Sequence, residues 1–551
     1  MTVTEGPAAG PVTRRRHRGA RRRGTGRAVA GLTWRLTRRG AAVVAASTGV
    51  YVVIEAVSYE AAYPDAASRA RLAAFGDDPA VRIMQGVPHA VDTVGGFVTW
   101  DAGWILQVIV SVWALIVAVR VLRGDEETGR TELVLTGSIR AGRALLAQLA
   151  VLVAACLLVG TTIGVAFSLA GAALPGALLF GAEVAGVAAF FVAVAAVAAQ
   201  VFVARSRAVS VAAAVLGAAV LVRMVANSAD SRSWIGWLTP LGWMDQLRPF
   251  GDDRWPVLAV PVGVVVVLVV TAIRLRDARD TGAGLVGGQE SRRSRLWGLG
   301  SPLAFAWRTN LAVLVGWVAG LAIWSLVIGL LVRSVADFIA ADPSYRDLLA
   351  TLGVRVSDVP RTFVALASVI TGLVIALFAA WRIGAAWTEE AAARLEHLVT
   401  RPVLRRRWLG GHVVLMLGSV VLLTAVSATA MWLGGSVTGA DLSVGDAFAS
   451  MFNTVPAVVV FGGLAVLVYG VAPRVTVAVT ASAAIATYVL QVVGPMLSWP
   501  EAVIGISPFR HLEAVPVDPF GLTAAVVMVA IGVAATVAGV LAFERRDLVG
   551  A

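Results

Sequence analysis

The segment RGDEETGRTELVLTGSIRAGR, residues 123–143, is a polar island between two long apolar runs. A similar segment, WTEEAAARLEHLVTRPVLRRR, occupies residues 387–407 and also lies between two apolar runs. We call these segments the first island and the second island. Two islands of similar composition in a mostly apolar chain predict that the chain consists of two related halves.

The rest of the chain is far more apolar than a soluble protein. Of its 551 residues, 58% are hydrophobic and 15% are charged, whereas soluble domains carry roughly 25% charged residues. The apolar residues form continuous runs of about 20, which is the length of a helix that crosses a bilayer. Strands of a membrane barrel would alternate apolar and polar residues instead. The sequence therefore predicts an all-α polytopic membrane protein.

Twelve such runs are expected to be transmembrane helices. They lie near residues 41–57, 102–121, 145–170, 177–203, 208–226, 256–273, 311–332, 362–381, 412–434, 447–472, 475–492 and 520–542. Arginine is concentrated in every second connecting segment, which is the pattern of cytoplasmic loops. The intervening segments are more acidic, for example residues 59–82. This alternation predicts that both termini of the chain are cytoplasmic.

The order of the segments repeats along the chain. We expect a basic cytoplasmic tail at 1–26, a first six-span half at 27–273, a cytoplasmic linker at 274–298 and a second six-span half at 299–551. Six spans return a chain to the side of the membrane from which it started. The two halves would therefore form a parallel tandem repeat, unlike the inverted repeats of many secondary transporters.

An outer segment before the last span of each half has a similar centre, WLTPLGWMDQLRPF at 237–250 and GISPFRHLEAVPVDPF at 505–520. A proline interrupts a helix, and such interruptions at membrane depth occur where the backbone lies within protein or lines water. The candidates for an apolar outer gate are Pro240, Trp243, Pro508 and Phe509. Tryptophans also form ordinary belts at membrane interfaces, which is the alternative interpretation.

The two islands share an order of residue types. When Arg130 is aligned with Arg394, Glu126 aligns with Glu390 and Glu132 aligns with Glu396. The four-residue spacing of Glu126 and Arg130 favours a surface helix with a stabilising acid–base pair. An ordinary inner loop would explain the arginines but not the acids and the neighbouring leucines. We therefore interpret each island as a docking element for a cytoplasmic partner.

Several functions are excluded or disfavoured by the residues that are missing. The chain contains no lysine, so it cannot contain the phosphate-binding loop G-x-x-x-x-G-K-[ST], and a partner would have to supply any ATP-driven work. The histidines are scattered without metal-ligand spacing, and the one cysteine, Cys156, lies in an apolar run. We expect no metal site and no cofactor bound by this chain.

The first 39 residues contain eleven arginines and one acidic residue, Glu5. Such a tail can bind nucleic acid, or it can orient a membrane protein and touch anionic lipid. Because the tail directly precedes an apolar run, we expect membrane lipid rather than nucleic acid as its partner.

Ionisable residues within a span indicate function by default. Glu183 lies in the fourth apolar run and is a possible pathway charge, which could meet a cationic substrate or Arg223. The alternative is that the fourth span begins later and Glu183 lies near the surface. Arg223 lies at an outer span end, where its side chain can extend to the interface.

The pattern EETGRTELVLTGSIRAGR between the second and third spans resembles the coupling region of type-2 ABC exporter permeases. The doubled six-span plan is similar to actinobacterial permeases described as exporters of polyketide antibiotics, in which two permease halves are fused. The resemblance covers essentially the whole chain after the basic tail. It implies the permease subunit of an ATP-driven exporter in the bacterial plasma membrane, which moves hydrophobic or amphipathic compounds such as polyketide antibiotics or drugs.

The resemblance also implies partners and their contacts. Two copies of a separate ABC ATPase subunit would bind the ATP and Mg, and the island helices would dock in grooves of these subunits. The implied docking residues are Glu126, Arg130, Glu132 and Leu133 for one copy and Glu390, Arg394, Glu396 and Leu398 for the other. In the second island Ala393 replaces Gly129 and Pro402 replaces Ser138, so the two contacts would be unequal.

The same resemblance implies two further features. Residues 27–39 and 299–310 would be amphipathic elbow helices along the inner membrane surface. Residues 231–250 and 496–516 would be re-entrant outer helices that close the pathway.

Other functions remain as alternatives. An ion-coupled secondary transporter would need buried carboxylates at midplane, for which Glu183 is a candidate. A non-transporting membrane sensor or scaffold would use the islands only for docking. An intramembrane enzyme would need a metal set or a Ser/His pair in the spans, and the sequence shows neither.

Overall fold

The computed structural model describes residues 12–135, 139–280, 282–285, 302–341, 358–391, 404–496 and 499–547. In these residues the regular structure consists of helices, without a β-strand. The chain divides into two compact units, Met1–Arg292 and Arg293–Ala551. The first unit and the second unit are described separately below.

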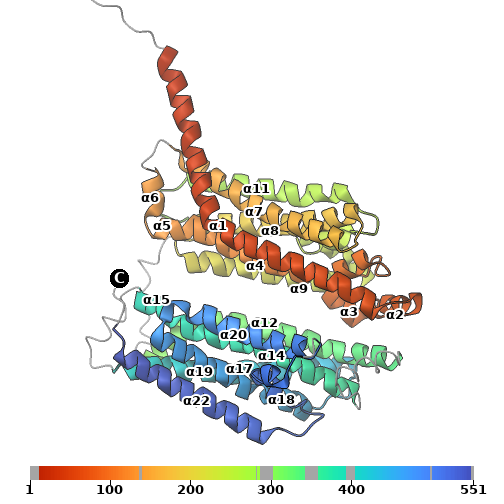
Figure 1. Cartoon of the computed structure of the whole chain (residues 1–551). Helices are drawn as coiled ribbons and strands as arrows, with labels where there is room; N and C mark the ends of the chain where they lie inside the picture. Colours follow the sequence, from red (N-terminus) through yellow and green to blue (C-terminus); the bar gives the residue numbers. More distant parts are fainter. Residues whose placement is uncertain are drawn as a thin grey trace, which may run out of the picture. The chain divides into compact units, whose positions relative to one another are not determined.

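The long helices of the first unit lie side by side (Figure 1). They are α1 (Val12–Ala62), α4 (Val94–Val119), α7 (Ala141–Leu169), α8 (Leu174–Val201), α9 (Arg205–Asn227) and α11 (Ala259–Asp277). The short helices α2 (Ala66–Gly76) and α3 (Pro79–Gln85) lie at one end of this unit, and α5 (Asp125–Glu127) and α6 (Arg130–Leu135) lie at the other end. Helix α8 is central, because α4, α7, α9 and α11 all pack against it.

The second unit has a similar composition of long and short helices. Its members are α12 (Pro302–Ala341), α14 (Val359–Gly384), α15 (Ala386–Ala391), α17 (Arg405–Thr438), α18 (Val444–Asn453), α19 (Val455–Val471), α20 (Thr476–Met496), α21 (Glu501–Ile504) and α22 (Leu522–Arg545). The most extensive packing is between α12 and α17 and between α19 and α22.

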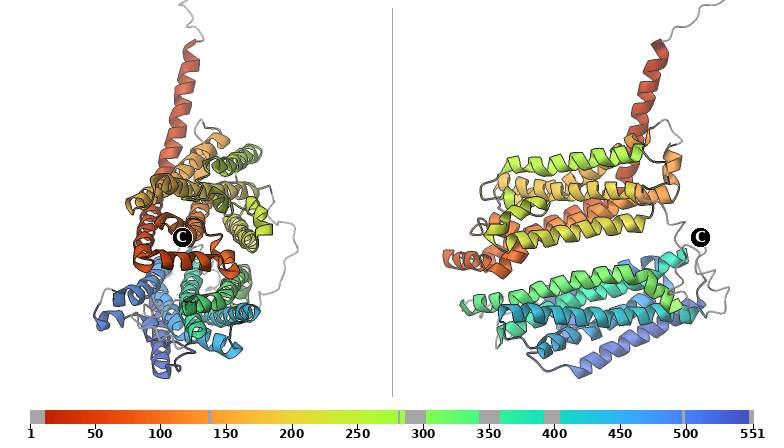
Figure 2. Two further views of the ribbon diagram at one scale, coloured as in Figure 1. Left: turned by 90° about the vertical axis from the view of Figure 1, so that its right-hand side faces the viewer. Right: turned by 180° about the vertical axis from the view of Figure 1, so that it is seen from behind.

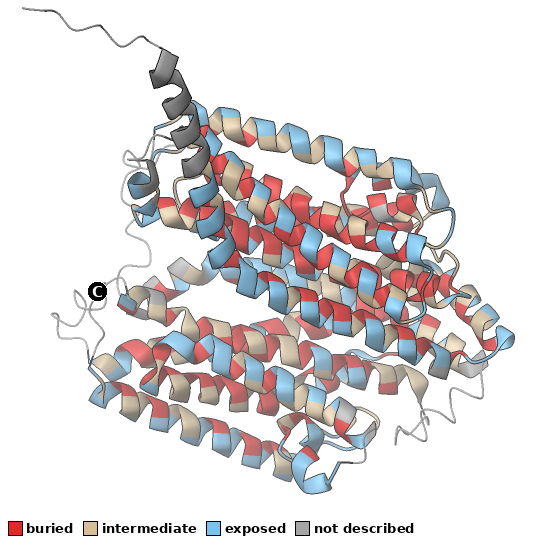
Figure 3. Cartoon of the chain, turned by 45° about the horizontal axis from the view of Figure 1, so that its top comes forward, coloured by how far each residue is buried: buried red, intermediate tan, exposed pale blue. Residues whose placement is uncertain are grey.

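Twelve helices in the described residues are long and apolar enough to cross a membrane. Each of the twelve runs predicted from the sequence overlaps one of them, so the prediction of an all-α protein with about twelve spans is confirmed. Buried residues follow the faces that the helices turn toward one another within each unit, whereas the outer faces are exposed (Figure 3). Those exposed faces are rich in Val, Leu and Ile, as expected for contact with lipid.

The last long helix has the least buried apolar window of the first unit and the second least buried window of the second unit. Helix α11 lies at the edge of the first unit in Figures 1 and 2, and only 11% of its apolar window is buried. Helix α22 lies at the edge of the second unit, with 22% of its window buried. Much of the surface of both helices therefore faces outward from its unit.

The elbow segments are not separate helices. Residues 27–39 belong to α1, which continues without interruption into the first span, and residues 302–310 are the start of α12. Residues 299–301 lie outside the described residues, and the location of both segments along the inner membrane surface stays a prediction. Helix α1 is continuous here because no proline interrupts residues 27–57, and each glycine costs only about 1 kcal/mol in a helix.

The outer segments contain the predicted interruptions. In the first unit a 3-10 helix, η2 (Asp230–Leu238), is separated from α10 (Trp243–Leu247) by a break that contains Pro240. In the second unit α21 is followed by a 3-10 helix, η5 (Pro508–His511), that begins with Pro508. The described parts of both segments are thus pairs of short helices rather than single long ones.

Close contact between glycines joins α19 to α22. A Cβ atom added to Gly463 would lie 2.2 Å from the carbonyl oxygen of Gly532, and one added to Gly470 would lie 2.3 Å from the carbonyl oxygen of Gly539. Small residues at such positions let the backbones of membrane helices approach closely. The two contacts are seven residues apart on both helices, which places them on one face.

We predict that Gly463→Val separates α19 from α22. The added side chain collides with a backbone carbonyl that cannot rotate away, and overpacking of this kind costs about 1–3 kcal/mol. Thermal melting of the purified protein should show a lower midpoint. Gly418→Val is the matched control, because a Cβ atom there meets nothing within 4 Å. Equal melting midpoints for the two variants would contradict the prediction.

Candidate functional site

The first island begins as a continuation of α4. The chain passes from α4 into a π-helical turn, η1 (Arg120–Gly124), and then into α5. Helix α5 ends at Glu127, and Gly129, which follows in the turn before α6, has a φ of 72° in the left-handed region that favours glycine. Glu126 and Arg130 therefore do not share one surface helix, and that prediction is wrong. Arg130 instead lies 3.6 Å from the carboxylate of Asp125.

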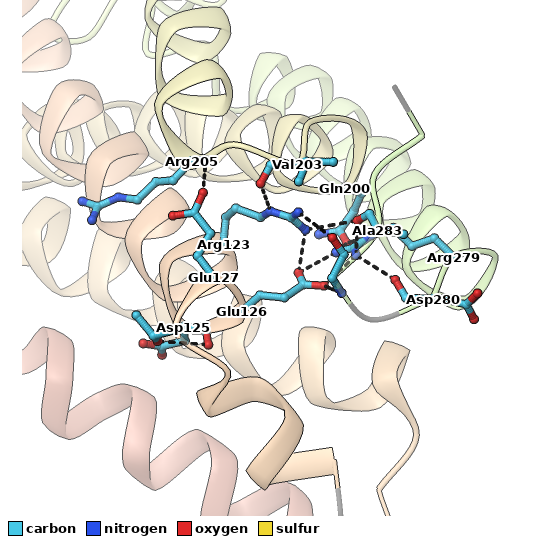
Figure 4. Close-up of polar contacts among 12 residues, drawn as sticks. Arg123, Asp125, Glu126, Glu127, Gln200, Val203, Arg205, Arg279, Asp280 and Ala283 are labelled. Carbon is cyan, nitrogen blue, oxygen red and sulfur yellow. Dashed lines mark hydrogen bonds and ion pairs between the residues drawn. The ribbon is translucent and has the colours of Figure 1, made fainter. Parts of the chain in front are cut away.

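Glu126 is buried and strongly bound within the chain (Figure 4). Its two carboxylate oxygens accept parallel hydrogen bonds from the guanidinium of Arg279, each 2.7 Å long. They also accept hydrogen bonds from Arg123 at 2.9 Å and from the backbone N–H of Gly282 at 2.7 Å. Bidentate pairing with arginine is among the stronger charge-assisted interactions in proteins. Arg279 follows the end of α11, so Glu126 joins the first island to the last long helix of its unit.

Arg123 completes this arrangement. It is 1% exposed, and besides Glu126 it donates to the carbonyl oxygens of Val203 at 2.6 Å and Gly282 at 3.2 Å. We call Arg123, Glu126 and Arg279 the first clamp. Buried charges are tolerated when they are paired and hydrogen-bonded, and the charges of the first clamp meet that condition. The contacts of these residues join the start of the first island, the segment after α8 and the segment after α11.

The second island contains an equivalent contact. Glu390 is 2% exposed and accepts hydrogen bonds from the hydroxyl of Tyr469 at 2.8 Å and from Arg546 at 2.9 Å. Tyr469 belongs to α19, and Arg546 directly follows the end of α22. We call Glu390, Tyr469 and Arg546 the second clamp. The two glutamates that align in the islands thus make the same kind of contact, each to an arginine after the last long helix of its own unit.

The C-terminal end of each island also contacts the end of the last long helix of its unit. In the first unit, the backbone N–H of Gly142 donates to Asp277, the last residue of α11, at 2.9 Å. In the second unit, Arg405 donates to the carbonyl oxygen of Arg546 at 2.9 Å. Both ends of each island are therefore attached to the end of the last long helix of their unit.

The structure divides the predicted docking residues into three groups. Glu126 and Glu390 are buried within the chain, so direct contact of their side chains with a partner is not compatible with this structure. Arg130, Glu132 and Leu133 are exposed. Arg394, Glu396 and Leu398 lie outside the described residues.

The outer gate candidates are packed into their units. Trp243 is 5% exposed, donates to the carbonyl oxygen of Trp237 at 2.9 Å, and packs edge-on against Phe190. Phe509 is 1% exposed and stacks on Phe461. Pro240 is buried and Pro508 is half-buried. These contacts anchor the outer segments, and a gate at these residues stays a prediction.

Glu183 lies inside the first unit rather than at its surface. It is 2% exposed, and one of its oxygens accepts a hydrogen bond from Gln107 of α4. Its other oxygen, Oε2, has no hydrogen-bond partner in the described part of the chain. The interpretation that placed Glu183 near the surface is therefore wrong, because α8 begins at Leu174 and carries Glu183 between neighbouring helices.

Arg223 is not an interfacial arginine either. It is 3% exposed and donates to the carbonyl oxygens of Met84 and Gln85 at 3.0 and 2.8 Å. It also pairs with Asp245 at 3.2 Å. Arg223 thus joins α9 to α3 and α10 instead of extending toward solvent.

No group of three His, Cys, Asp or Glu side chains in the described ranges could hold a metal ion. The candidate functional features of the described residues are thus the two clamps, the exposed residues of the first island, the buried Glu183 and the packed outer segments.

These features, together with the twelve apolar helices, define a multi-pass α-helical membrane protein. A family model described as the C-terminal domain of the multidrug efflux system permease Rv1217c matches residues 27–275 and 299–544. The chain is 31% identical over 496 residues to the multidrug efflux system permease protein Rv1217c of Mycobacterium tuberculosis, and the alignment covers 89% of each protein. The chain therefore belongs to the Rv1217c family of permeases.

Sequence reasoning did not find the partners of the two aligned glutamates. Arg279 and Arg546 stand among other arginines that follow the last spans, and composition alone does not distinguish them from ordinary cytoplasmic arginines. Tyr469 lies in an apolar run and looks like a packing residue. For Arg279 and Arg546, the one signal in the sequence was that each shortly follows the last span of its half.

We predict that Glu126→Gln destabilises the first unit. The substitution leaves Arg123 and Arg279 buried without a negative charge, and breaking a buried pair costs about 3–5 kcal/mol. Thermal melting should show a large loss for Glu126→Gln and almost none for the exposed control Glu132→Gln. The double variant Glu126→Gln, Arg279→Gln should recover part of the loss. A single variant as stable as the control would mean that the first clamp does not hold the unit together.

Proposed function

We propose that this chain is the membrane permease subunit of an ATP-driven ABC exporter. It would move hydrophobic or amphipathic compounds, such as polyketide antibiotics or other drugs, out of the cell. The Rv1217c relative is named a multidrug efflux permease, which supports export as the activity. The chain has no lysine, so hydrolysis of ATP and binding of Mg would belong to a separate ATPase subunit.

The observation that carries this proposal is the attachment of both islands to the last long helices. Glu126 is held by Arg279, and Glu390 is held by Arg546. A force applied to an island would pass through its clamp to the bundle, because both ends of the island are tied to the same helix end. Without such ties, a docked partner could move the island alone.

In this mechanism one ATPase copy docks on each island. Arg130, Glu132 and Leu133 form the contact on the first island, and Arg394, Glu396 and Leu398 form it on the second. Closure of the ATPase pair on ATP binding would pull the islands, and the helices would switch from inward- to outward-facing as rigid bodies. The clamp residues are positioning residues here, since they touch neither ATP nor cargo.

The proposed setting is the bacterial plasma membrane, with both termini cytoplasmic and two parallel six-span halves. Residues 1–26 would be the basic tail and residues 274–298 the linker between the halves. The arginines of the tail would contact anionic lipid headgroups.

The docking proposal is tested by reversing charge on both islands. We expect the neighbouring reading frame to encode an ATPase with a Walker A loop, and we expect that ATPase to co-purify with the wild type. The double variant Glu132→Arg, Glu396→Arg should lose it, because each substitution reverses a charge that the proposed contact depends on. Glu501→Arg, at an exposed residue of α21, is the matched control and should retain it. Retention by the double variant would refute docking through these residues.

Ion-coupled secondary transport is a second candidate function, and the buried Glu183 favours it. The two functions are separated by measuring efflux of a fluorescent hydrophobic dye from cells. We expect loss of the ATPase Walker lysine to abolish efflux and Glu183→Gln to leave most of it. Efflux that survives without the ATPase but not without the Glu183 carboxylate would establish the secondary transporter instead. A scaffold would show no efflux in any of these cells.

A further inference from the structure

The first unit contains an open pocket between α2 and the segment that joins α3 to α4, at the end of the unit opposite the first island (Figure 1). Its volume is about 460 Å³, within the range of roughly 300–1,000 Å³ that is typical of small-molecule sites. Most of its lining is apolar, and α2 contributes alanines along one face. The apolar lining residues are Ala66, Ala70, Ala73, Pro88, Ala90 and Val91.

The segment that joins α3 to α4 forms one wall of this pocket and is held in a defined conformation. Ala90 has a φ of 51° in the left-handed region, which is uncommon for a residue with a side chain. Its carbonyl oxygen accepts a hydrogen bond from the hydroxyl of Thr93 at 2.8 Å. The carbonyl oxygen of Val91 accepts one from the hydroxyl of Tyr59 at 3.0 Å. Because these contacts fix the wall, little backbone ordering is needed when a ligand binds.

Two acidic side chains give the pocket a negative character. Asp77 follows the last residue of α2 and Asp92 lies in the joining segment, and neither carboxylate has an ion pair or a hydrogen bond within the described ranges. The last turn of α2 contains no basic residue, so the partial negative charge of this helix end adds to that of Asp77.

The one basic residue of the lining, Arg69, is engaged by the wall itself. Its Nε atom donates to the carbonyl oxygen of Tyr63 at 3.0 Å, and its guanidinium carbon lies 5.4 Å from the centre of the Tyr59 ring. A cation over an aromatic ring is attracted to it. The carboxylates of Asp77 and Asp92, which are both exposed, therefore remain available to a positively charged ligand.

The composition of the lining indicates which kind of ligand fits. A calcium ion takes six to eight oxygen ligands, whereas this lining supplies two carboxylates among apolar side chains. An organic cation uses both parts of the lining, because its charge attracts the carboxylates and its apolar body removes the alanine face from water. An anion would be repelled by the two acids, and a neutral compound would leave them unused.

We propose that this pocket binds an amphipathic organic cation. The charge of the ligand lies near Asp77 and Asp92, and its apolar part lies against Ala66, Ala70 and Ala73 of α2. The site is independent of the proposed export activity, because binding requires the folded first unit but neither the ATPase nor ATP. In the proposed orientation this end of the unit is extracellular, so the ligand would enter from outside the cell.

The test is equilibrium dialysis of radiolabelled tetraphenylphosphonium against the purified full chain in a neutral detergent. The wild type should bind this cation saturably. The double variant Asp77→Asn, Asp92→Asn should bind it about tenfold more weakly, since each partly exposed charge contact contributes roughly two- to fivefold. Glu60→Gln removes an exposed acid at the same end of the unit that does not line the pocket, and it should keep the wild-type affinity.

A second variant tests the volume of the pocket separately from its charge. Ala70→Phe adds a ring at an exposed position of α2 and leaves both acids in place, so it should fold and bind tetraphenylphosphonium more weakly. Melting midpoints equal to that of the wild type would confirm that this variant and the double variant are folded.

Competitors distinguish the class of ligand. Triphenylphosphine oxide, which is neutral and has a similar apolar surface, should not displace the cation, and displacement by it would overturn the role of charge. Calcium chloride should displace no more than sodium chloride of equal ionic strength, and a stronger effect of calcium would show a divalent-cation site instead. Wild-type affinity in the double variant would place the binding elsewhere, and an equal loss in Glu60→Gln would show only general surface attraction.

Discussion

A carboxylate buried at the end of a helical bundle has to meet a positive charge, and this constraint organises both units. Glu126 and Glu390 are buried because Arg279 and Arg546 accompany them. The same contacts hold the islands against the ends of α11 and α22, the last long helices of the two units. Breaking either pair would leave a buried charge that the low-dielectric interior does not tolerate. The clamps thus place the polar segments and secure the outermost helices at the same time.

The clamps would have little effect in a loose bundle. Within the second unit, α19 and α22 approach at Gly463 and Gly470 until carbonyl oxygens lie where side chains would otherwise be. In lipid there is no hydrophobic drive between helices, so such close packing supplies much of the cohesion. A rigid α19–α22 pair carries Tyr469 on one helix and ends at Arg546 on the other, and both groups hold Glu390. Packing and ion pairing therefore reinforce each other.

The two units differ in which charged and polar residues they bury and in what surrounds them. The first unit surrounds its buried arginine, Arg123, with a carboxylate and carbonyls, whereas in the second unit the buried Arg382 lies 3.0 Å from Nδ1 of His412. The tenth residue of α8 is the buried acid Glu183, whereas the tenth residue of α18 is the neutral Asn453, which donates to a backbone carbonyl at 2.8 Å. Buried charge is thus distributed unequally between the two units.

The sequence by itself determined the all-α membrane class, the twelve spans and the absence of a lysine-dependent ATP site. These properties depend on local composition, because any helix in lipid must be long, apolar and internally hydrogen-bonded. Only the tertiary structure decided which charges are paired. It separated Glu126 from Arg130 at Gly129, joined Glu126 to Arg279 across the unit, and placed Glu183 in the interior. Partners more than a hundred residues apart leave no periodic trace in a sequence, since their contact depends on how whole helices pack.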